Sequence, residues 1–201
     1  MKIIGLTGGI GMGKSTAAQA FRRARIPVFD ADAAVHHMYE RGGRAVRPIG
    51  AAFPGTVVNG AVDRGALRNV VFGNPEKFRQ LEHLVHPLVW QAEAEAIAQA
   101  RRAGKRAVVI DNPLLFEMKR PNWMRWHKPF DQAIVVSAPQ NIQIHRVRLR
   151  GKMTTEQIKA VIAKQMPDAE KRRRADVVIR TGLSRHVTIR PLRRLILELL
   201  A

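Results

Sequence analysis

The chain has 201 residues, of which 46% are hydrophobic, and this suits a single domain with insertions and a substantial buried core. It contains no cysteine, which excludes disulfide bonds and thiolate metal sites. The 35 lysine and arginine residues outnumber the 16 aspartate and glutamate residues, giving a formal net charge of +19. Such an excess bears on binding partners, either nucleic acid or small polyanionic substrates, and not on the fold.

No stretch approaches the length of a membrane span, so we expect no membrane partner. The chain starts directly with a predicted core strand, so we expect no signal peptide. From these features we predict a cytoplasmic location, and we favour a monomer.

The first predicted strand, residues 2–7, leads into Gly8-Gly9-Ile10-Gly11-Met12-Gly13-Lys14-Ser15, and a helix is predicted over 15–23. The segment fits the phosphate-loop pattern of glycine, four residues and Gly-Lys-Ser/Thr. Backbone N–H groups of such a loop and the following helix N-terminus bind phosphate. Lys14 would reach the β- and γ-phosphates, and the Ser15 hydroxyl would ligate Mg²⁺. A plain glycine-rich turn is the alternative, but the strand–loop–helix order favours a nucleotide site.

A second strand is predicted over 26–29 and is followed by Asp30-Ala31-Asp32. Ligands of open α/β sheets bind at the carboxyl ends of strands, so both aspartates are expected in the same crevice as the phosphate loop. If the backbone stays extended, the two side chains lie on one side. Aspartate also caps helices, and a helix is predicted over 33–40. We therefore expect one aspartate to cap this helix and the other to do chemistry.

The middle of the chain is predicted to be mainly helical. A short helical segment is expected between residues 43 and 54, and Asp63 caps a predicted helix over 64–72. Asn74-Pro75 starts a further helix that ends near Gly104. Pro87 is expected to kink or interrupt it. His83 and His86 are disfavoured as a metal pair because no further ligand cluster is in sight.

The next predicted strand, residues 106–111, ends in Asp111. Phosphate-loop enzymes place an acid near Mg²⁺ at such a strand end, so Asp111 is a candidate metal ligand, directly or through water. The segment 118–130 holds Trp123 and Trp126 and is interpreted as a surface loop. Packing of these tryptophans is favoured over stacking on bases.

Another strand is predicted over 132–136, followed by a helix from Pro139 to about residue 149. Thr154 and Gln157 form a capping box for a helix that ends near Gln165. A helix pair with arginines at its hinge is typical of a mobile lid over phosphates. The basic run 171–174 is interpreted as a solvated helix face. After a last strand over 176–179, one helical stripe should pack on the sheet: Leu192, Leu195, Ile196 and Leu199.

Strands separated by helices predict an α/β protein of three layers, with a parallel sheet and helices on both faces. We expect the P-loop nucleoside-triphosphate-hydrolase-type fold as one domain. Its core would comprise residues 1–61, 104–145 and 175–201, with a helical substrate-binding insertion over 62–103 and a lid over 146–165. The short chain, the arginine-rich lid and an aspartate able to accept a proton favour a small-molecule kinase. The Asn-Lys-x-Asp motif of GTPases is missing from the sequence.

The sequence closely resembles the dephospho-coenzyme A kinases over nearly its whole length. The resemblance starts with Gly5-Leu6-Thr7 and the phosphate loop, and continues with Asp30-Ala31-Asp32. It implies that ATP, with Mg²⁺, phosphorylates the ribose 3′-hydroxyl of dephospho-CoA in the last step of coenzyme A synthesis. Further matches follow in the family's order: Arg64-x-x-Leu67 with Val71-Phe72, Leu81-Glu82 with His86-Pro87, Pro113-Leu114-Leu115-Phe116-Glu117, Arg146 with Arg150, Gln165-Met166, and Ala175-Asp176-x-Val178-Ile179.

The resemblance also assigns roles to residues. It makes Asp32 the base and Arg146 a catalytic residue of the lid. Lys14 as the third catalytic residue, and Ser15 and Asp111 as metal ligands, directly or through water, follow from the phosphate-loop chemistry given above. The acceptor would contact Asp32, Arg64 and His86. ATP would contact Gly8, Gly9, Gly11, Met12, Gly13, Lys14, Ser15, Thr16, Arg146 and Arg150.

Two departures from the family pattern stand out. Met12 replaces the usual serine, where backbone groups make the contacts, so we expect little effect. Arg180-Thr181 stands where many members have Asp-Asn, so an adenine contact from that position is not carried over.

Two other functions compete with this assignment. One is another small-molecule kinase, acting on a nucleoside monophosphate or a sugar acid, but such kinases lack the Asp-Ala-Asp and His-Pro landmarks. The other is a nucleic acid binder that uses ATP as a switch, suggested by the charge of +19. The joint motif pattern disfavours both, so we do not expect nucleic acid as a partner.

Overall fold

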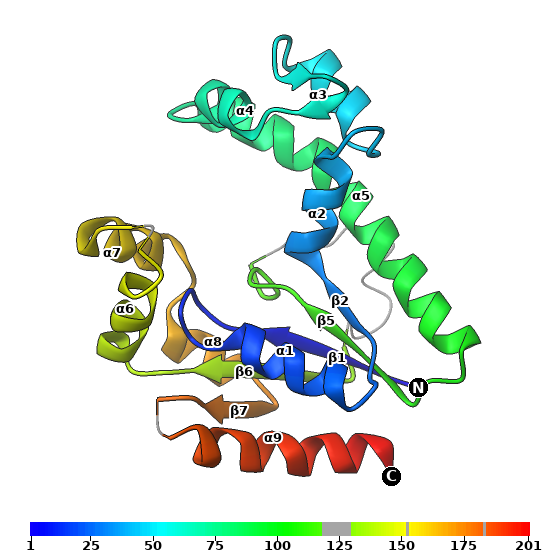
Figure 1. Ribbon diagram of the computed structural model, residues 1–201, viewed down its shortest axis with the longest axis vertical. Coiled ribbons are helices and arrows are strands. Elements are labelled where there is room, and N and C mark those ends of the chain that lie inside the picture. Colours follow the sequence, from blue (N-terminus) through cyan, green and yellow to red (C-terminus); the bar gives the residue numbers. More distant parts are fainter. Residues whose placement is uncertain (118–129, 152, 183) are drawn as a thin grey trace. The chain divides into compact units, whose positions relative to one another are not determined.

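The computed structural model describes residues 1–117, 130–151, 153–182 and 184–201. The chain forms two compact units, one of residues 1–29 with 99–201 and one of residues 30–98 (Figure 1). The tryptophans of the predicted surface loop lie outside the described residues. Within the described residues, no helix is both long enough and apolar enough to cross a membrane.

A five-stranded sheet forms the centre of the first unit (Figure 1). In spatial order its strands are β2 (Val28–Asp30), β5 (Ala107–Asp111), β1 (Lys2–Thr7), β6 (Gln132–Ser137) and β7 (Val177–Arg180). β1 pairs in parallel with β5 on one side and β6 on the other, and β6 pairs in parallel with β7. The middle residues of the three central strands are apolar and mostly buried, as expected for strands that are covered on both faces. The predicted α/β class and parallel sheet are confirmed.

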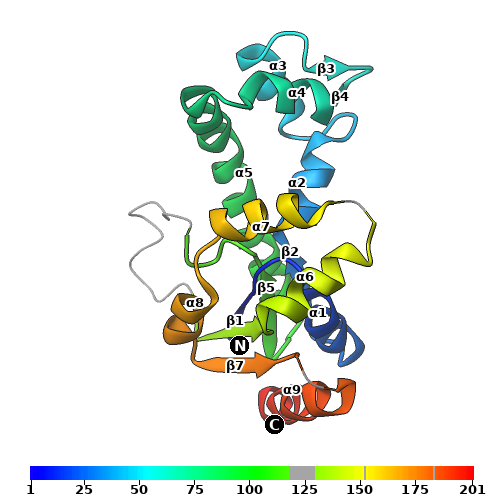
Figure 2. The same cartoon turned by 90° about the vertical axis from the view of Figure 1, so that its left-hand side faces the viewer.

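The helices of this unit are α1 (Lys14–Arg23), α6 (Gln140–Arg148), α7 (Thr155–Lys164), α8 (Asp168–Arg174) and α9 (Arg185–Leu200). Helices α1 and α9 pack against each other and share one core with the sheet. α9 lies beside β7 in both views (Figure 1, Figure 2). The predicted stripe lies in this core: Leu192, Leu195, Ile196 and Leu199 are each at least 93% buried. The capping box of Thr154 and Gln157 at the start of α7 is also confirmed.

On the basic run of α8 the sequence interpretation was wrong. The side chain of Lys171 is only 1% exposed, and its Nζ atom lies 2.8 Å from Oε1 of Glu117 and 2.7 Å from the carbonyl oxygen of Pro113. α8 packs against β6, so one side of this short helix faces the interior. A buried ammonium group requires a charged partner, and Glu117 provides it. The neighbouring Arg172 to Arg174 are exposed, as expected.

The second unit contains α2 (Ala31–Tyr39), α3 (Val46–Ala52), β3 (Val57–Val58), β4 (Ala61–Val62), α4 (Arg64–Val71) and most of α5 (Pro75–Arg102). The interruption expected at Pro87 does not occur, because α5 continues through it. Proline removes one helix donor, and a helix of 28 residues retains its other hydrogen bonds. Asp63 caps α4 as predicted, accepting hydrogen bonds from two backbone N–H groups.

Strands β3 and β4 form a hairpin that the sequence analysis missed. Asn59 and Gly60 connect them, with φ angles of 52° and 77°. Two consecutive positive φ values are typical of the type I′ turn, which joins antiparallel strands and favours Asn-Gly. The dipeptide was therefore a usable signal, although each strand is only two residues long.

Candidate active site

The phosphate loop leaves the sheet at the carboxyl end of β1, between β5 and β6. Open parallel sheets bind ligands at the carboxyl ends of the strands where the strand order reverses, because the connections from the two neighbouring strands leave on opposite sides of the sheet there. Gly11 and Gly13 have φ angles of 74° and 94°, which favour glycine. A Cβ atom on Gly11 would also lie 2.7 Å from the carbonyl oxygen of Gln143, so α6 sits directly against the loop. Both glycines are therefore required for the loop to adopt this shape.

The loop presents free backbone donors. The N–H groups of Gly11, Gly13, Lys14 and Ser15 donate no hydrogen bond to any residue that the structure describes. Lys14 and Ser15 form the first turn of α1, where helix geometry leaves N–H groups without intrahelical acceptors. The helix dipole adds partial positive charge at the same place. Together these groups form a site for an anion such as phosphate.

Lys14 is paired with the acid that the sequence placed at the end of β5. Its Nζ atom lies 2.5 Å from Oδ1 of Asp111, and the two side chains are 16% and 3% exposed. The Ser15 residue is exposed and follows Lys14 in α1. A hydroxyl and a carboxylate are oxygen ligands of the kind that Mg²⁺ prefers. Among the described residues no group of three or more His, Cys, Asp or Glu could hold a metal by itself.

Two glutamines hold the peptide groups of Ile10 in the middle of the loop. The Nε2 group of Gln143 donates to the carbonyl oxygen of Ile10 at 2.7 Å, and Oε1 of Gln165 accepts from its N–H at 3.1 Å. Gln143 comes from α6, and Gln165 follows α7. In the sequence, Gln165 stands out only as a family landmark, and no pattern singles out Gln143. Contacts over 133 and 155 residues leave no local sequence signal.

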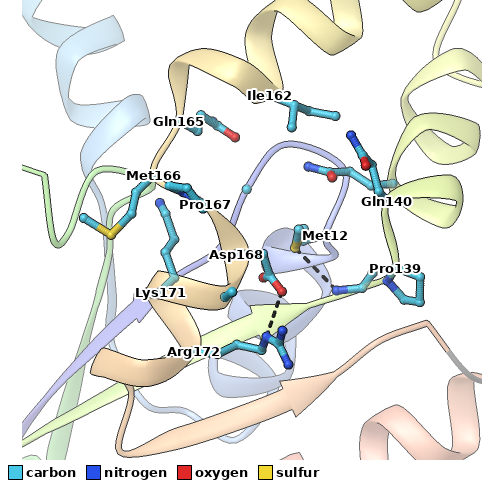
Figure 3. A pocket seen from close by; sticks show the side chains of 14 residues that line it. Met12, Pro139, Gln140, Ile162, Gln165, Met166, Pro167, Asp168, Lys171 and Arg172 are labelled. Carbon is cyan, nitrogen blue, oxygen red and sulfur yellow. Dashed lines mark hydrogen bonds and ion pairs between the residues drawn. The ribbon is translucent and has the colours of Figure 1, made fainter.

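A pocket of about 420 Å³ lies beside this part of the loop (Figure 3). The Met12 side chain points into it and is 4% exposed, and its Sδ atom accepts a hydrogen bond from the N–H of Ala138 at 3.4 Å. Asp168 and Arg172 form an ion pair on another wall. At position 12, therefore, the side chain makes contacts as well as the backbone, which the sequence analysis had not expected.

The arginines predicted for the lid line a second pocket, of about 440 Å³. The Nη1 and Nη2 groups of Arg146 donate to the hydroxyl and the carbonyl oxygen of Thr181, at 3.0 and 2.5 Å. Arg150, which follows α6, is exposed. Gly11, Gly13 and Thr16 line the same pocket, so its wall includes the phosphate loop. The first unit thus brings both arginines to the predicted ATP residues.

Asp30 and Asp32 differ from the extended arrangement considered for them. α2 begins at Ala31, so Asp30 is its N-cap, with Oδ1 accepting from the N–H of Ala33 at 3.0 Å. Asp32 lies in the first helical turn, is exposed and has no partner among the described residues. The expectation that one aspartate caps the helix is confirmed. The alternation of an extended chain does not apply, because helical geometry starts immediately after Asp30.

Arg64 and His86 also belong to the second unit. Arg64 is the exposed first residue of α4. Burial raises the pKa of the Tyr39 hydroxyl, and the charge of Arg64 partly offsets this. The ring of His86 lies 5.8 Å from that of Trp90. Burial lowers the pKa of His86, outweighing the opposite effect of Glu82, so its imidazole is neutral at pH 7.

Comparison with known proteins decides the family. A family model described as dephospho-CoA kinase matches residues 2–184. The chain belongs to the dephospho-CoA kinase family. A dephospho-CoA kinase of Paramagnetospirillum magneticum is 53% identical over 172 residues, which are 86% of this chain and 78% of the relative. The resemblance inferred from the motifs is therefore confirmed.

Solved structures share the fold of this chain. A crystal structure of a Thermus thermophilus protein has a TM-score of 0.81 and 34% identity, covering 98% of this chain and 97% of the other. A dephospho-CoA kinase from Campylobacter jejuni has a TM-score of 0.66 at 22% identity, with the same coverage, which shows a shared fold. All the site residues assigned from the sequence lie within the range that matches the dephospho-CoA kinase family.

Proposed function

We propose that this chain transfers the γ-phosphoryl group of ATP to the ribose 3′-hydroxyl of dephospho-CoA and so makes coenzyme A, the final step of its biosynthesis. The observation that carries the proposal is the match to the dephospho-CoA kinase family over residues 2–184. The four free N–H donors of the phosphate loop and the first turn of α1 support the binding of a nucleoside triphosphate. A cytoplasmic location and a monomeric state remain predictions.

The phosphate loop would bind the ATP phosphates through Gly8, Gly9 and residues 11–16. Preorganised donors of this kind stabilise charge that develops during transfer without further reorganisation. Lys14 would contribute a full positive charge at the β- and γ-phosphates. Asp111, at 2.5 Å, keeps this ammonium group in the loop before a nucleotide arrives.

Magnesium fits the residues that are present. The hydroxyl of Ser15 and the carboxylate of Asp111 would hold it, directly or through water, while substrate phosphates supply other oxygens. Bound Mg²⁺ would neutralise charge on the β- and γ-phosphate oxygens.

Asp32 would act as the general base. Its carboxylate is exposed and unpaired among the described residues, so it is available to an acceptor hydroxyl. In the transfer, a bond forms between the ribose 3′-oxygen and the γ-phosphorus, and the bond from that phosphorus to the β–γ bridging oxygen breaks. The hydroxyl proton passes to Asp32.

We further propose that the helical insertion 62–103 receives the acceptor, with Arg64 and His86 contacting it. The lid 146–165 would cover ATP, with Arg146 and Arg150 on its phosphates. Closure would exclude water from the transferring group.

An ADP-release assay tests the function against its rivals. Purified protein is given ATP, Mg²⁺ and dephospho-CoA, or one of a panel of nucleoside monophosphates and sugar acids. We expect turnover with dephospho-CoA alone, with the product's new phosphate located on the 3′-oxygen. Faster turnover with a panel member would identify a different small-molecule kinase. RNA binding that weakens with modest salt, without any phosphoryl transfer, would support a nucleic acid binder.

A further inference from the structure

Thr181, the residue after β7, connects three separate segments around the pocket of about 440 Å³ that is lined by Arg146 and the phosphate loop. It is 4% exposed. Its hydroxyl lies 2.5 Å from the carbonyl oxygen of Met12 in the phosphate loop and 3.0 Å from Nη1 of Arg146 in α6. Its own N–H donates to the carbonyl oxygen of Ser137 at 2.8 Å. The β7 end, the phosphate loop and the lid helix therefore meet at one side chain.

The hydrogen bonds of this hydroxyl can be assigned individually. A threonine hydroxyl has one proton to donate and two lone pairs that accept. The guanidinium of Arg146 can only donate, so it uses a lone pair. The proton then goes to Met12, because the alternative acceptor, the carbonyl oxygen of Ser137, is 3.4 Å away against 2.5 Å. A charged donor on one side of a hydroxyl strengthens the bond that it donates on the other.

The bond to Met12 fixes the direction of a phosphate-binding donor. The carbonyl of Met12 and the N–H of Gly13 belong to one planar trans peptide, so they point in opposite directions. With the carbonyl held by Thr181, the N–H of Gly13 is turned away from Thr181. This N–H is one of the free donors of the loop. The left-handed conformation of Gly13, with φ of 94°, maintains this orientation.

The bonds to Arg146 fix the position of the lid arginine. Two of its N–H groups are held by one residue, through the hydroxyl and the carbonyl oxygen of Thr181. A guanidinium has five N–H groups, so three remain for a ligand. Arg146 and Thr181 line the same pocket of about 440 Å³.

We propose that Thr181 is a positioning residue for ATP, and that its hydroxyl is the group that positions the binding residues. The hydroxyl aligns the Gly13 N–H and the Arg146 guanidinium for the same nucleotide phosphates. Arg146 is thus held in place before the nucleotide binds. The inference deepens the proposed kinase function and rests on it, because it assumes that ATP occupies this pocket.

Two substitutions of Thr181 separate the hydroxyl from the shape of the side chain. Thr181→Val keeps the shape and removes the hydroxyl, whereas Thr181→Ser keeps the hydroxyl. We expect the valine variant to bind a non-hydrolysable ATP analogue roughly tenfold more weakly by calorimetry, as expected for the loss of one charge-assisted hydrogen bond. KM for ATP should rise equally, while KM for dephospho-CoA stays unchanged. The serine variant should stay within about twofold of wild type in both its affinity for the analogue and its KM for ATP. This change is well below the roughly tenfold effect expected for the loss of the hydrogen bond.

A double-mutant cycle tests whether Thr181 acts through Arg146. In the Arg146→Ala background the valine substitution should weaken binding of the analogue clearly less than tenfold, because the shared bond is already lost. Equal loss in both backgrounds would overturn the part of the inference that concerns Arg146. Should Thr181→Val fail to fold, Thr181→Ser and Thr181→Ala provide the same comparison, since they differ only in the hydroxyl.

If Thr181→Val binds the analogue with wild-type affinity, the inference is overturned, whether or not the melting temperature changes. The hydroxyl then has a purely structural role. Binding of the ATP analogue does not require dephospho-CoA or any other phosphoryl acceptor. The binding test therefore still gives a result if the proposed function is wrong. If dephospho-CoA is phosphorylated and the valine variant binds the analogue normally, only the inference fails.

Discussion

Nζ of Lys14 and Oδ1 of Asp111 lie 2.5 Å apart in a nearly buried ion pair between the phosphate loop and the end of the adjacent strand. The lysine proposed to act on phosphates is thus already held by a carboxylate. An incoming nucleotide adds a second anionic partner at the same ammonium group. The pair therefore links stability of the loop to its activity, and substitutions at the two positions should separate these effects.

Lys14→Ala should lower kcat by roughly 10²-fold or more, since it removes a charge aimed at the transferring phosphoryl group. It should also lower the melting temperature, because the carboxylate of Asp111 loses its lysine partner. Adding Asp111→Asn should recover much of the stability and none of the activity. Steady-state assays and thermal melts measure both effects. Near-normal turnover of Lys14→Ala would remove the lysine from the mechanism.

Asp32→Asn should lower kcat by roughly 10²- to 10⁴-fold, the usual contribution of a general base. Affinity for ATP should stay close to wild type. The matched control is Asp30→Ala, which removes the N-cap of α2 and should cost about 1 kcal/mol of stability with little change in kcat. The reverse pattern, an active Asp32→Asn and an inactive Asp30→Ala, would show that Asp30 is the base.

Binding of ATP should slow amide exchange in α7. If the lid closes over the nucleotide, its opening must compete with binding. At ligand concentrations 100 times the dissociation constant, protection can rise by up to about 100-fold. Exchange in α9, which packs in the core of the sheet, provides the reference. Equal exchange in α7 with and without ATP would make α6 and α7 an ordinary helix pair.

His86 should make the protein less stable in acid. Its pKa in the folded chain is lowered from the ordinary value of 6.5, mainly by burial. As pH falls below 6.5, the unfolded chain takes up this proton more readily than the folded chain, so stability falls. Well above that pH His86 is neutral in both states and the effect vanishes.

The melting temperature of His86→Gln should therefore fall less than that of wild type between pH 7 and 5, a range chosen to span about one unit on either side of the ordinary histidine pKa. Parallel profiles for wild type and His86→Gln would contradict the effect of burial.

Lys171→Met should destabilise the protein by about 3 kcal/mol, because it leaves the partly buried carboxylate of Glu117 without its cation. Oε2 of Glu117 is buried and has no hydrogen bond partner within the described residues, so it depends on this charge. The double variant with Glu117→Gln should regain more than half of the loss in urea unfolding. Additive losses would show that the two side chains act independently.

Much of the fold follows from local sequence patterns. The predicted strands agree with the observed ones to within one or two residues, because a strand buried on both faces is a continuous apolar segment bounded by polar residues. The caps formed by Asp63 and Thr154 follow from side chains that bond to their own backbone neighbours. Such interactions span only a few residues and are visible in the sequence.

The parts of the site that escaped prediction depend on contacts across the chain. The hydrogen bond that Thr181 donates to Met12 and the one that Gln165 accepts from Ile10 span 169 and 155 residues. Lys171 looked like part of a solvated run because its partner Glu117 is distant in sequence. Side chains whose partners are fixed only by the sheet order give no periodic signal, so the phosphate loop was evident and its supports were not.

The order of strands in the sheet also determines when the site can exist. β1, the central strand, is made first by the ribosome, and its neighbours β5 and β6 begin about 100 and 125 residues later. At roughly 5–20 residues per second, β1 waits for about 5–20 s before its first partner is synthesised. The loop that follows β1 must wait for Thr181 as well. The nucleotide-binding sequence is therefore present in the nascent chain long before the segments that shape it have been made.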